Sequence, residues 1–194
     1  MFSLNQQGPY YPTPAHISAI HQIKIVFSFV IITIFFPVSF AERNPIKIHI
    51  ANPQLVGAGR MTFLFFNIYD AELYASEKKW NKNKPFALKL TYLRHFKGRE
   101  ISKRSVEEIF KLGFDTQETL DNWQGQMDAI FPDVVSGSVI IGIKDSNGHA
   151  VFYYDEKFIG SIKDVEFTRW FFDIWLGRKS SDLRLRAKLI NADG

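Results

Sequence analysis

The sequence predicts an α+β protein in which helices cover an antiparallel β-sheet. Three observations predict this class. Strand-like runs occupy much of residues 45–96, apolar residues recur at helical spacing over residues 101–130, and short alternating runs return over residues 138–162. Strands and helices that are segregated along the chain are typical of this class, whereas α/β proteins alternate them. No repeat or linker divides the chain after residue 41, so we expect one domain there.

The first 41 residues differ in composition from the rest. A polar leader without acidic residues precedes an almost wholly apolar run of twelve residues, 25–36, which Pro37 ends. Small residues at Ser39 and Ala41 suit a signal peptidase. We therefore expect a cleaved signal peptide over residues 1–41 and a periplasmic protein. An uncleaved inner-membrane anchor is the alternative, although about 18 apolar residues are needed to span a bilayer. We expect membrane contact only through this segment, and only if it stays uncleaved.

Residues 42–194 are expected to be the folded domain, and their composition excludes several classes of function. The chain has no cysteine, so it has neither disulfides nor a thiolate nucleophile. The domain's histidines, His49, His95 and His149, are isolated in sequence, which predicts no metal site and no cofactor. The 24 basic and 20 acidic residues of the whole chain are interspersed, and this argues against a nucleic-acid partner, which requires a concentrated basic surface.

Strands are expected in the first half of the domain. Residues 45–52 alternate isoleucine with other residues, which predicts an opening strand. The glycines of Val56–Gly59 predict a flexible turn. Residues 60–75 are rich in aromatic and aliphatic side chains, as in a long central strand or a strand pair. Residues 86–96 alternate again and predict another strand.

Two consecutive helices are expected next. Ser102 is a candidate N-cap of the first helix, and Gly113 suits its C-terminal end. Asp115 and Glu118 have the spacing of a capping box at the start of the second helix, which ends before Pro132. The pair is expected to form a helical hairpin that lies against a sheet.

The last third predicts a three-stranded meander followed by helices. Short alternating runs fill residues 138–162, and Asn147-Gly148 favours a tight turn between two of them. Asp164 is expected to cap a helix with aromatic residues on one face. Residues 182–190 alternate as a strand does, but Ser181 is an acceptable helix cap, and we favour a helix.

The sequence contains no motif of the common hydrolases or nucleotide-dependent enzymes. It has no G-x-S-x-G nucleophile turn, no phosphate-binding loop and no dinucleotide fingerprint. Glu107 and Glu108 are adjacent on the expected helix, so their side chains point about 100° apart and do not form a general acid and base pair. We expect both to lie on a solvated face.

Polar residues embedded among apolar ones are the candidate ligand-binding residues: Arg60, Tyr69, Tyr92 and Arg104. An arginine at the mouth of an apolar cleft can bind a carboxylate through charged hydrogen bonds, and a tyrosine hydroxyl can add another. This pattern predicts a small hydrophobic or acidic ligand such as a fatty acid. The alternative is that the arginines form surface ion pairs with Asp70, Glu72 or Glu107 and that the tyrosines fill the core.

Several separated phrases in one order resemble the bacterial chalcone isomerase-like proteins. They occupy residues 56–75, 85–109, 123–134, 158–164 and 167–177, and the resemblance covers nearly all of residues 53–190. It implies an open-faced sandwich, in which a large antiparallel sheet is layered with helices and a cleft lies between them. This agrees with the fold class predicted from the residue patterns.

The resemblance also implies a role for individual residues. The family includes plant enzymes that cyclise chalcones to flavanones and plant relatives that bind fatty acids. Arg60 is the counterpart of an arginine that holds the enzymes' substrate, and Tyr69 stands where they carry a threonine. Ile101 and Glu108 stand where they carry a tyrosine and an asparagine. Because most of the catalytic set is replaced, we assign no catalytic residue and expect an exported, non-catalytic binding protein with Arg60 as anion anchor.

Two other functions remain open at this point. The first is an isomerase of the intramolecular lyase kind that acts on an unknown substrate, with Arg60 as clamp and a tyrosine as acid. The second is a periplasmic interaction module, in which an exposed aromatic helix face around Trp170–Trp175 docks on a membrane protein.

Overall fold

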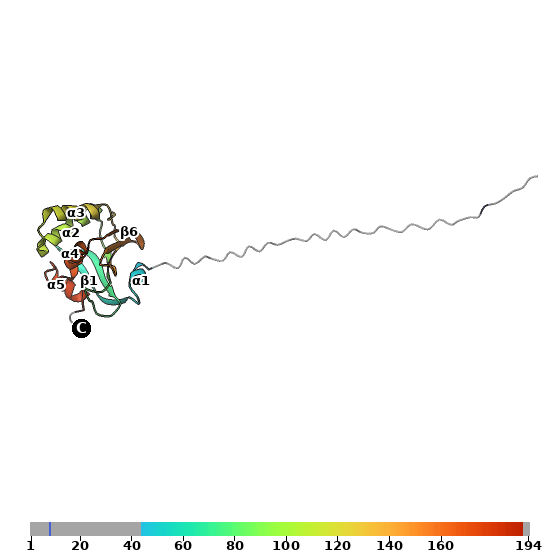
Figure 1. Cartoon of the computed structure of the whole chain (residues 1–194), viewed down its shortest axis with the longest axis horizontal. Helices are drawn as coiled ribbons and strands as arrows, with labels where there is room; N and C mark the ends of the chain where they lie inside the picture. The colour runs from blue at the N-terminus through green and yellow to red at the C-terminus, as the bar shows by residue number, and fades with distance from the viewer. Residues whose placement is uncertain (1–7, 9–43, 192–194) are drawn as a thin grey trace, which may run out of the picture. The chain divides into compact units, whose positions relative to one another are not determined.

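The structure, a computed structural model, describes residue 8 and residues 44–191, so nearly all of the expected signal peptide lies outside the described residues (Figure 1). Residues 44–191 contain a six-stranded antiparallel sheet in which each strand pairs with the next along the chain. The strands are β1 (Gln54–Phe63), β2 (Phe66–Ala75), β3 (Phe86–Tyr92), β4 (Val139–Lys144), β5 (Ala150–Tyr154) and β6 (Lys157–Ile162).

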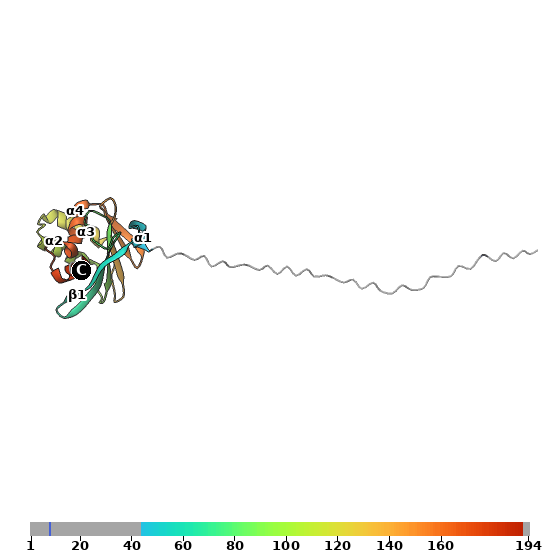
Figure 2. The same cartoon turned by 90° about the horizontal axis from the view of Figure 1, so that it is seen from below.

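Most of the described helices lie on one side of this sheet, and one short helix lies on the other (Figures 1 and 2). The larger core contains side chains of α2 (Gly98–Leu112), α3 (Gln117–Asp128), α4 (Val165–Leu176) and α5 (Leu183–Leu189). Next to the smaller core on the opposite face is α1 (Pro45–His49). The predicted α+β class, with helices layered on an antiparallel sheet, is confirmed.

The larger core forms where alternate side chains of the strands meet the helices. Leu73 and Leu88 are opposite each other in the β2–β3 register and are both fully buried. Phe152 of β5 packs edge to face against Phe131 and Phe171, with ring centroids 5.0 and 5.3 Å apart. Each large apolar side chain buried in this way contributes about 1.5–3 kcal/mol, so this core holds the helices on the sheet.

The prediction of an opening strand over residues 45–52 is wrong, because the chain forms helix α1 there. The Oδ1 atom of Asn44 accepts a hydrogen bond from the backbone N–H of Ile46 at 2.9 Å, and Pro45 occupies the first helical position. Ile46 and Ile50 are four residues apart, and both are buried against the outer face of the sheet. Isoleucines at every second position suggested a strand, but a spacing of four residues is also that of one face of a helix.

The expected flexible turn at Val56–Gly59 is also wrong, since these residues lie within β1. The hairpin turn is formed instead by Leu64 and Phe65, and the strand pair expected over residues 60–75 is confirmed. Gly57 instead allows close packing between β1 and α5. A Cβ atom on Gly57 would stand 2.1 Å from the carbonyl oxygen of Lys188, so only glycine lets α5 lie directly on β1.

The helical hairpin is confirmed, but its first helix begins earlier than predicted. Helix α2 starts at Gly98 because a carboxylate oxygen of Glu100 accepts a hydrogen bond from the N–H of Lys97 at 3.0 Å. Ser102, the expected cap, lies inside the helix and donates to the carbonyl of Gly98. Gly113 ends the helix as predicted, with a φ of 110° that suits glycine.

The second half of the domain follows the prediction more closely. The meander is present, and Gly148 occupies a left-handed position in the turn between β4 and β5. Asp164 caps α4 as predicted. The helix favoured for residues 182–190 is confirmed as α5, although its cap is Asp182 rather than Ser181.

The aromatic residues of α4 do not form an exposed docking face, so that expectation is wrong. Phe171, Phe172 and Trp175 are buried, and the ring of Phe172 lies 4.8 Å from that of Phe86 on the sheet. Trp170 is half-buried. This face is occupied by intramolecular packing, and the interaction-module hypothesis loses the surface on which it depended.

Replacing Gly57 tests the packing of α5 on β1. Gly57→Ala is expected to lower the free energy of unfolding by about 1–3 kcal/mol, because the new methyl group collides with the Lys188 carbonyl. Gly125, exposed in α3 with open space where a Cβ atom would stand, provides the matched control, and Gly125→Ala is expected to be neutral or to stabilise by up to about 1 kcal/mol. Urea unfolding measures both, and equal effects would contradict the close approach.

Candidate functional site

A cavity of about 450 Å³ lies between the sheet and helices α2, α4 and α5. Its walls are mostly apolar and come from both layers, with Met61, Leu90 and Ile140 on strands and Phe171 and Trp175 on α4. Pockets that hold small molecules in proteins usually measure about 300–1,000 Å³ and are lined in this way. The cavity therefore has the size and surface of a site for a small hydrophobic molecule.

Two tyrosines on neighbouring strands lie side by side in this cavity. Tyr69 of β2 is directly opposite Tyr92 of β3 in the antiparallel register, and their ring centroids are 5.9 Å apart. Both face the helices, because residues opposite each other in the register share one face of the sheet and these two belong to the larger core. The register thus brings the two predicted tyrosines together.

The hydroxyl groups of these tyrosines have unused hydrogen-bonding capacity. The indole N–H of Trp175 donates to the Tyr69 oxygen at 2.8 Å, and no described residue accepts the Tyr69 proton. Tyr92 is only 4% exposed, yet its hydroxyl has no hydrogen-bond partner among the described residues. Burial raises the pKa of both groups, so both stay neutral at physiological pH and can donate.

Arg104 also lines the cavity, but its charge is already paired. Its Nη2 atom lies 2.6 Å from Oε1 of Glu108, and its Nη1 atom lies 3.6 Å from Glu107. Glu108 also accepts hydrogen bonds from Lys111 at 2.9 Å and from the hydroxyl of Ser181. Burial alone would raise the pKa of Glu108, but these donors and the two positive charges outweigh it and hold the pKa below its ordinary value.

The charged residues that line the cavity are Glu100, Arg104, Glu108 and Asp182. Three of these are acidic and one is basic, so the charged rim is negative overall. Two of the acidic groups accept hydrogen bonds from nearby backbone N–H groups: Glu100 from Lys97, and Asp182 as the cap of α5. An anionic ligand group would therefore meet no free positive charge among the lining residues.

Arg60 lies outside the cavity, contrary to the expectation that it stands at the cavity mouth. Its guanidinium makes a two-point ion pair with Asp70, with Nε–Oδ1 and Nη2–Oδ2 distances of 2.6 and 2.9 Å. Arg60 and Asp70 are opposite each other in the β1–β2 register, and their neighbours Met61 and Tyr69 face the helices. Arg60 is therefore on the other face of the sheet, as in the surface ion-pair alternative.

The structure thus brings Tyr69, Tyr92 and Arg104 together and separates Arg60 from them. The prediction that Glu107 and Glu108 share a solvated face is correct for Glu107 and wrong for Glu108, which is buried at the cavity wall.

Trp175 and Ser181 belong to the site but were not among the residues predicted from the sequence. Trp175 follows Phe171 by four residues, a spacing that places both on one buried face of the helix. A buried tryptophan usually needs an acceptor for its N–H, so this spacing could have indicated that Trp175 has a polar partner. Ser181 carries no comparable signal, because its partner Glu108 is distant in sequence.

Other features of the described residues limit the chemistry. Among residues 44–191 no group of three or more histidine or acidic side chains is arranged to hold a metal ion. No helix in this part of the chain is long and apolar enough to cross a membrane.

Comparisons with known proteins agree with this architecture. A family model described as chalcone isomerase-like matches residues 38–191. An uncharacterized protein of Haemophilus influenzae is 24% identical over 143 residues, which are 72% of this chain and 69% of that protein. The crystal structure of a fatty-acid binding protein of Arabidopsis thaliana has a TM-score of 0.56 and 18% identity, covering 73% of this chain and 88% of that one. The last likeness shows a shared fold.

Replacing Glu108 tests the polar cluster at the cavity wall. Glu108→Gln is expected to lower the free energy of unfolding by about 2 kcal/mol at pH 7, because an amide cannot accept from Ser181, Arg104 and Lys111 together. Glu107→Gln, at an exposed position, is the matched control and is expected to change it by less than about 1 kcal/mol.

The pH dependence gives a second test of this cluster. The folded-state pKa of Glu108 lies below its ordinary value of 4.5, so its contribution is present above that value and is lost as the pH falls through the folded pKa. The difference between the wild type and Glu108→Gln is therefore expected to be larger at pH 7 than at pH 3 in urea unfolding. The same difference at both pH values would show that the carboxylate charge is not involved.

Proposed function

We propose that this chain, which belongs to the chalcone isomerase-like family, is a non-catalytic binding protein for a small hydrophobic, fatty-acid-like ligand. The ligand lies in the cavity between sheet and helices. The observation that carries the proposal is an apolar cavity of about 450 Å³ that contains two tyrosine hydroxyls with unused donor capacity.

The apolar walls determine the main part of the ligand. Removal of apolar surface from water contributes about 0.8 kcal/mol per buried CH₂ group, so an alkyl chain is favoured in this cavity. Phe96, Phe131 and Ile174 add to the walls formed by Met61 and Leu90, and they offer such a chain no hydrogen-bonding side chain.

The tyrosine pair determines the polar end of the ligand. Tyr69 and Tyr92 both stay neutral and can donate, so the complementary group is an acceptor oxygen. An ionised carboxylate would lie in an apolar cavity near Glu100, Glu108 and Asp182, while the cation of Arg104 is already engaged. We therefore propose that the acceptor is the carbonyl oxygen of a protonated acid or an ester.

The fold comparison supports this assignment. The Arabidopsis protein with a similar fold is named a fatty-acid binding protein, and it shares the sheet-and-helix architecture that encloses the cavity here. Fold alone does not determine function, so the proposal rests on the cavity and its tyrosines.

An isomerase of the intramolecular lyase kind remains the alternative, and the lining residues favour it less. Such a reaction requires a base near the reacting carbon. The pKa of Glu108 is lowered by donors that already occupy its carboxylate, and Asp182 is engaged as a helix cap. Neither group is well placed to accept a proton, so we propose binding rather than turnover.

We also propose that the protein acts in the periplasm after cleavage behind Ala41. The support is the sequence pattern of residues 1–41, and an inner-membrane anchor is the alternative. The intact mass of the protein from fractionated cells tests this. We expect a soluble form that begins at Glu42, whereas an uncut chain in the membrane fraction would contradict export with cleavage.

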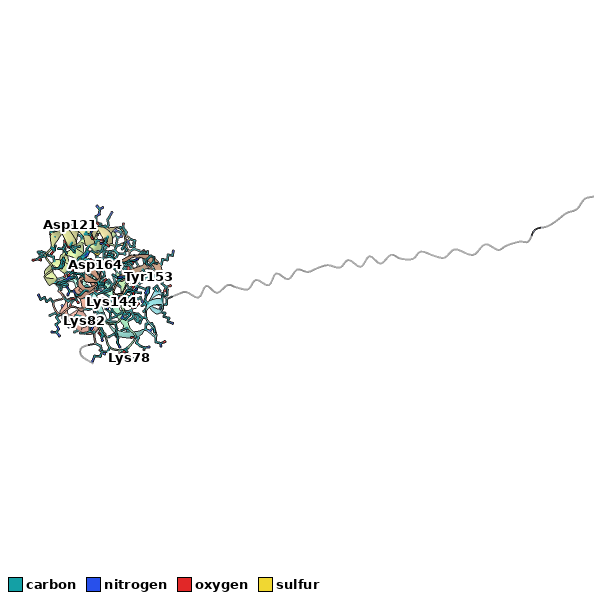
Figure 3. All side chains as sticks on the ribbon, viewed as in Figure 1. Lys78, Lys82, Asp121, Lys144, Tyr153 and Asp164 are labelled. Atoms are coloured by element: carbon teal, nitrogen blue, oxygen red, sulfur yellow. The ribbon has the colours of Figure 1, made fainter. Side chains whose placement is uncertain are left out.

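Removing one hydroxyl tests the proposed ligand contact. Tyr92→Phe is expected to weaken the binding of dodecanoic acid by about three- to tenfold, the loss of one neutral hydrogen bond, in displacement of a fluorescent fatty acid. Tyr153→Phe is the matched control, because the Tyr153 hydroxyl pairs with His49 at 2.9 Å on the outer face of the sheet. Tyr153 is labelled in Figure 3. Arg60→Ala is also expected to leave binding unchanged.

Two outcomes would contradict this assignment. One is binding that is unchanged by both Tyr92→Phe and Tyr69→Phe. The other is a loss of binding on Arg60→Ala, which would restore the anion-anchor role first expected for that residue.

The pH dependence of binding tests whether the acid enters in its neutral form. The affinity for dodecanoic acid is expected to rise as the pH falls from about 8 to about 6, by at most about tenfold per pH unit, because the ligand takes up a proton on binding. Its methyl ester has no titrating group and is expected to bind equally across this range. An acid that binds more tightly at higher pH would show that the carboxylate is the bound form.

A further inference from the structure

The tip of the β1–β2 hairpin is an exposed apolar surface that the ligand-binding proposal does not explain. It consists of four consecutive residues, Phe63, Leu64, Phe65 and Phe66, which we call the apolar tip. All four are exposed, and Phe65 is as exposed as in an extended chain, with a relative accessibility of 104%. Single exposed apolar residues are common on proteins, but a contiguous cluster marks an interaction site.

The apolar tip projects beyond the rest of the sheet. Strand β3 ends at Tyr92, which is opposite Tyr69, and Phe65 is four residues further along the hairpin. At about 3.3 Å per residue, the tip extends roughly 13 Å past this row. Figure 2 shows the hairpin, next to the label β1, extending away from the body of the domain. This projecting shape suits insertion into a deformable surface such as a lipid bilayer.

The turn itself does not require these residues. Leu64 and Phe65 have φ values of 46° and 70°, which the two-residue turns of hairpins require and which asparagine and glycine adopt most readily. Bulky side chains rarely occupy this region. Leucine and phenylalanine are thus less favourable for folding than asparagine or glycine. This indicates that their side chains have a role other than forming the turn.

A short basic segment begins at the base of the tip, where Arg94 contacts Phe66. The guanidinium of Arg94 lies 4.5 Å from the centre of the Phe66 ring, and His95, Lys97 and Arg99 follow in the loop and the first turn of α2, all exposed. The nearest acidic residue in this segment is Glu100, which accepts the backbone hydrogen bond of Lys97. An apolar projection with cations at its base is complementary to a bilayer with anionic headgroups.

We propose that the apolar tip inserts into the surface of an anionic lipid bilayer, with Arg94, Lys97 and Arg99 at the phosphate level. Phe63 belongs both to the tip and to the cavity lining, so insertion brings the cavity next to the lipid. A ligand with an alkyl chain could then exchange between bilayer and cavity without crossing water. The exchange role rests on the proposed function, whereas insertion of the tip is independent of it.

A single label tests the insertion directly in the full chain. Because the protein contains no cysteine, Leu64→Cys can carry one polarity-sensitive fluorophore at the tip. With vesicles of phosphatidylcholine containing phosphatidylglycerol, its emission is expected to shift to shorter wavelength and to be quenched by brominated lipid. Ser146→Cys, exposed in the β4–β5 turn at the other end of the sheet, is the matched control and is expected to stay in water.

A second variant separates insertion from folding. Phe65→Gly in the labelled chain places glycine at a left-handed position, so folding is retained. It is expected to raise the vesicle concentration for half-maximal shift by at least about tenfold, the effect of losing one buried aromatic side chain. Vesicles of phosphatidylcholine alone are expected to bind more weakly, because they lack the anionic headgroups.

Several outcomes would overturn the inference. They are an unshifted emission at position 64 in the presence of vesicles, equal shifts at positions 64 and 146, and equal binding with and without phosphatidylglycerol. Attachment through residues 25–36 would act on both labelled chains alike, so the difference between positions 64 and 146 reports insertion of the tip. Fatty-acid binding without vesicles tests the proposed function separately, so failure of one does not imply failure of the other.

Discussion

The antiparallel register of β1, β2 and β3 is the constraint on which the site depends. Because side chains alternate between the two faces of a sheet, the register that pairs Tyr69 with Tyr92 sends both toward the helices. The same alternation sends Arg60 and its partner Asp70 to the outer face. A slip of one residue would exchange these sets. The identity of the cavity's polar groups is therefore a consequence of strand pairing rather than of residue type alone.

The helices cover this face of the sheet and complete the walls of a partly open cavity. Phe171 and Trp175 of α4 pack over the sheet, and the Trp175 N–H also holds the Tyr69 oxygen. On the α2 side, Glu108 joins Arg104 and Ser181 into one satisfied polar cluster. The charged groups of the cavity rim already have partners within the protein, whereas the tyrosine hydroxyls inside have unused donor capacity. A lipid-like ligand is complementary to the apolar walls, the neutral donors and the apolar hairpin tip beside the cavity.

The fold was predictable from the sequence where one periodicity dominated, as in the meander over residues 138–162 and the helical hairpin. It was mispredicted at residues 45–52, since isoleucines at alternate positions satisfy both a strand and one face of a short helix, and the cap at Asn44 decided the outcome. The tyrosines were identifiable as polar residues in apolar strands. The position of Arg60 required the hairpin register, and this was hidden because the turn at Leu64 and Phe65 carries neither asparagine nor glycine.

The cavity is proposed to hold a hydrophobic ligand with its acceptor oxygen at the tyrosine pair. A crystal structure with a terminally brominated dodecanoic acid tests it most directly, because anomalous scattering locates the tail while the density locates the head. We predict a bromine site among the apolar walls and a ligand oxygen within about 3 Å of the Tyr92 or Tyr69 hydroxyl. A head group bound at Arg60 on the outer face, or a cavity left empty at saturating ligand, would contradict the account.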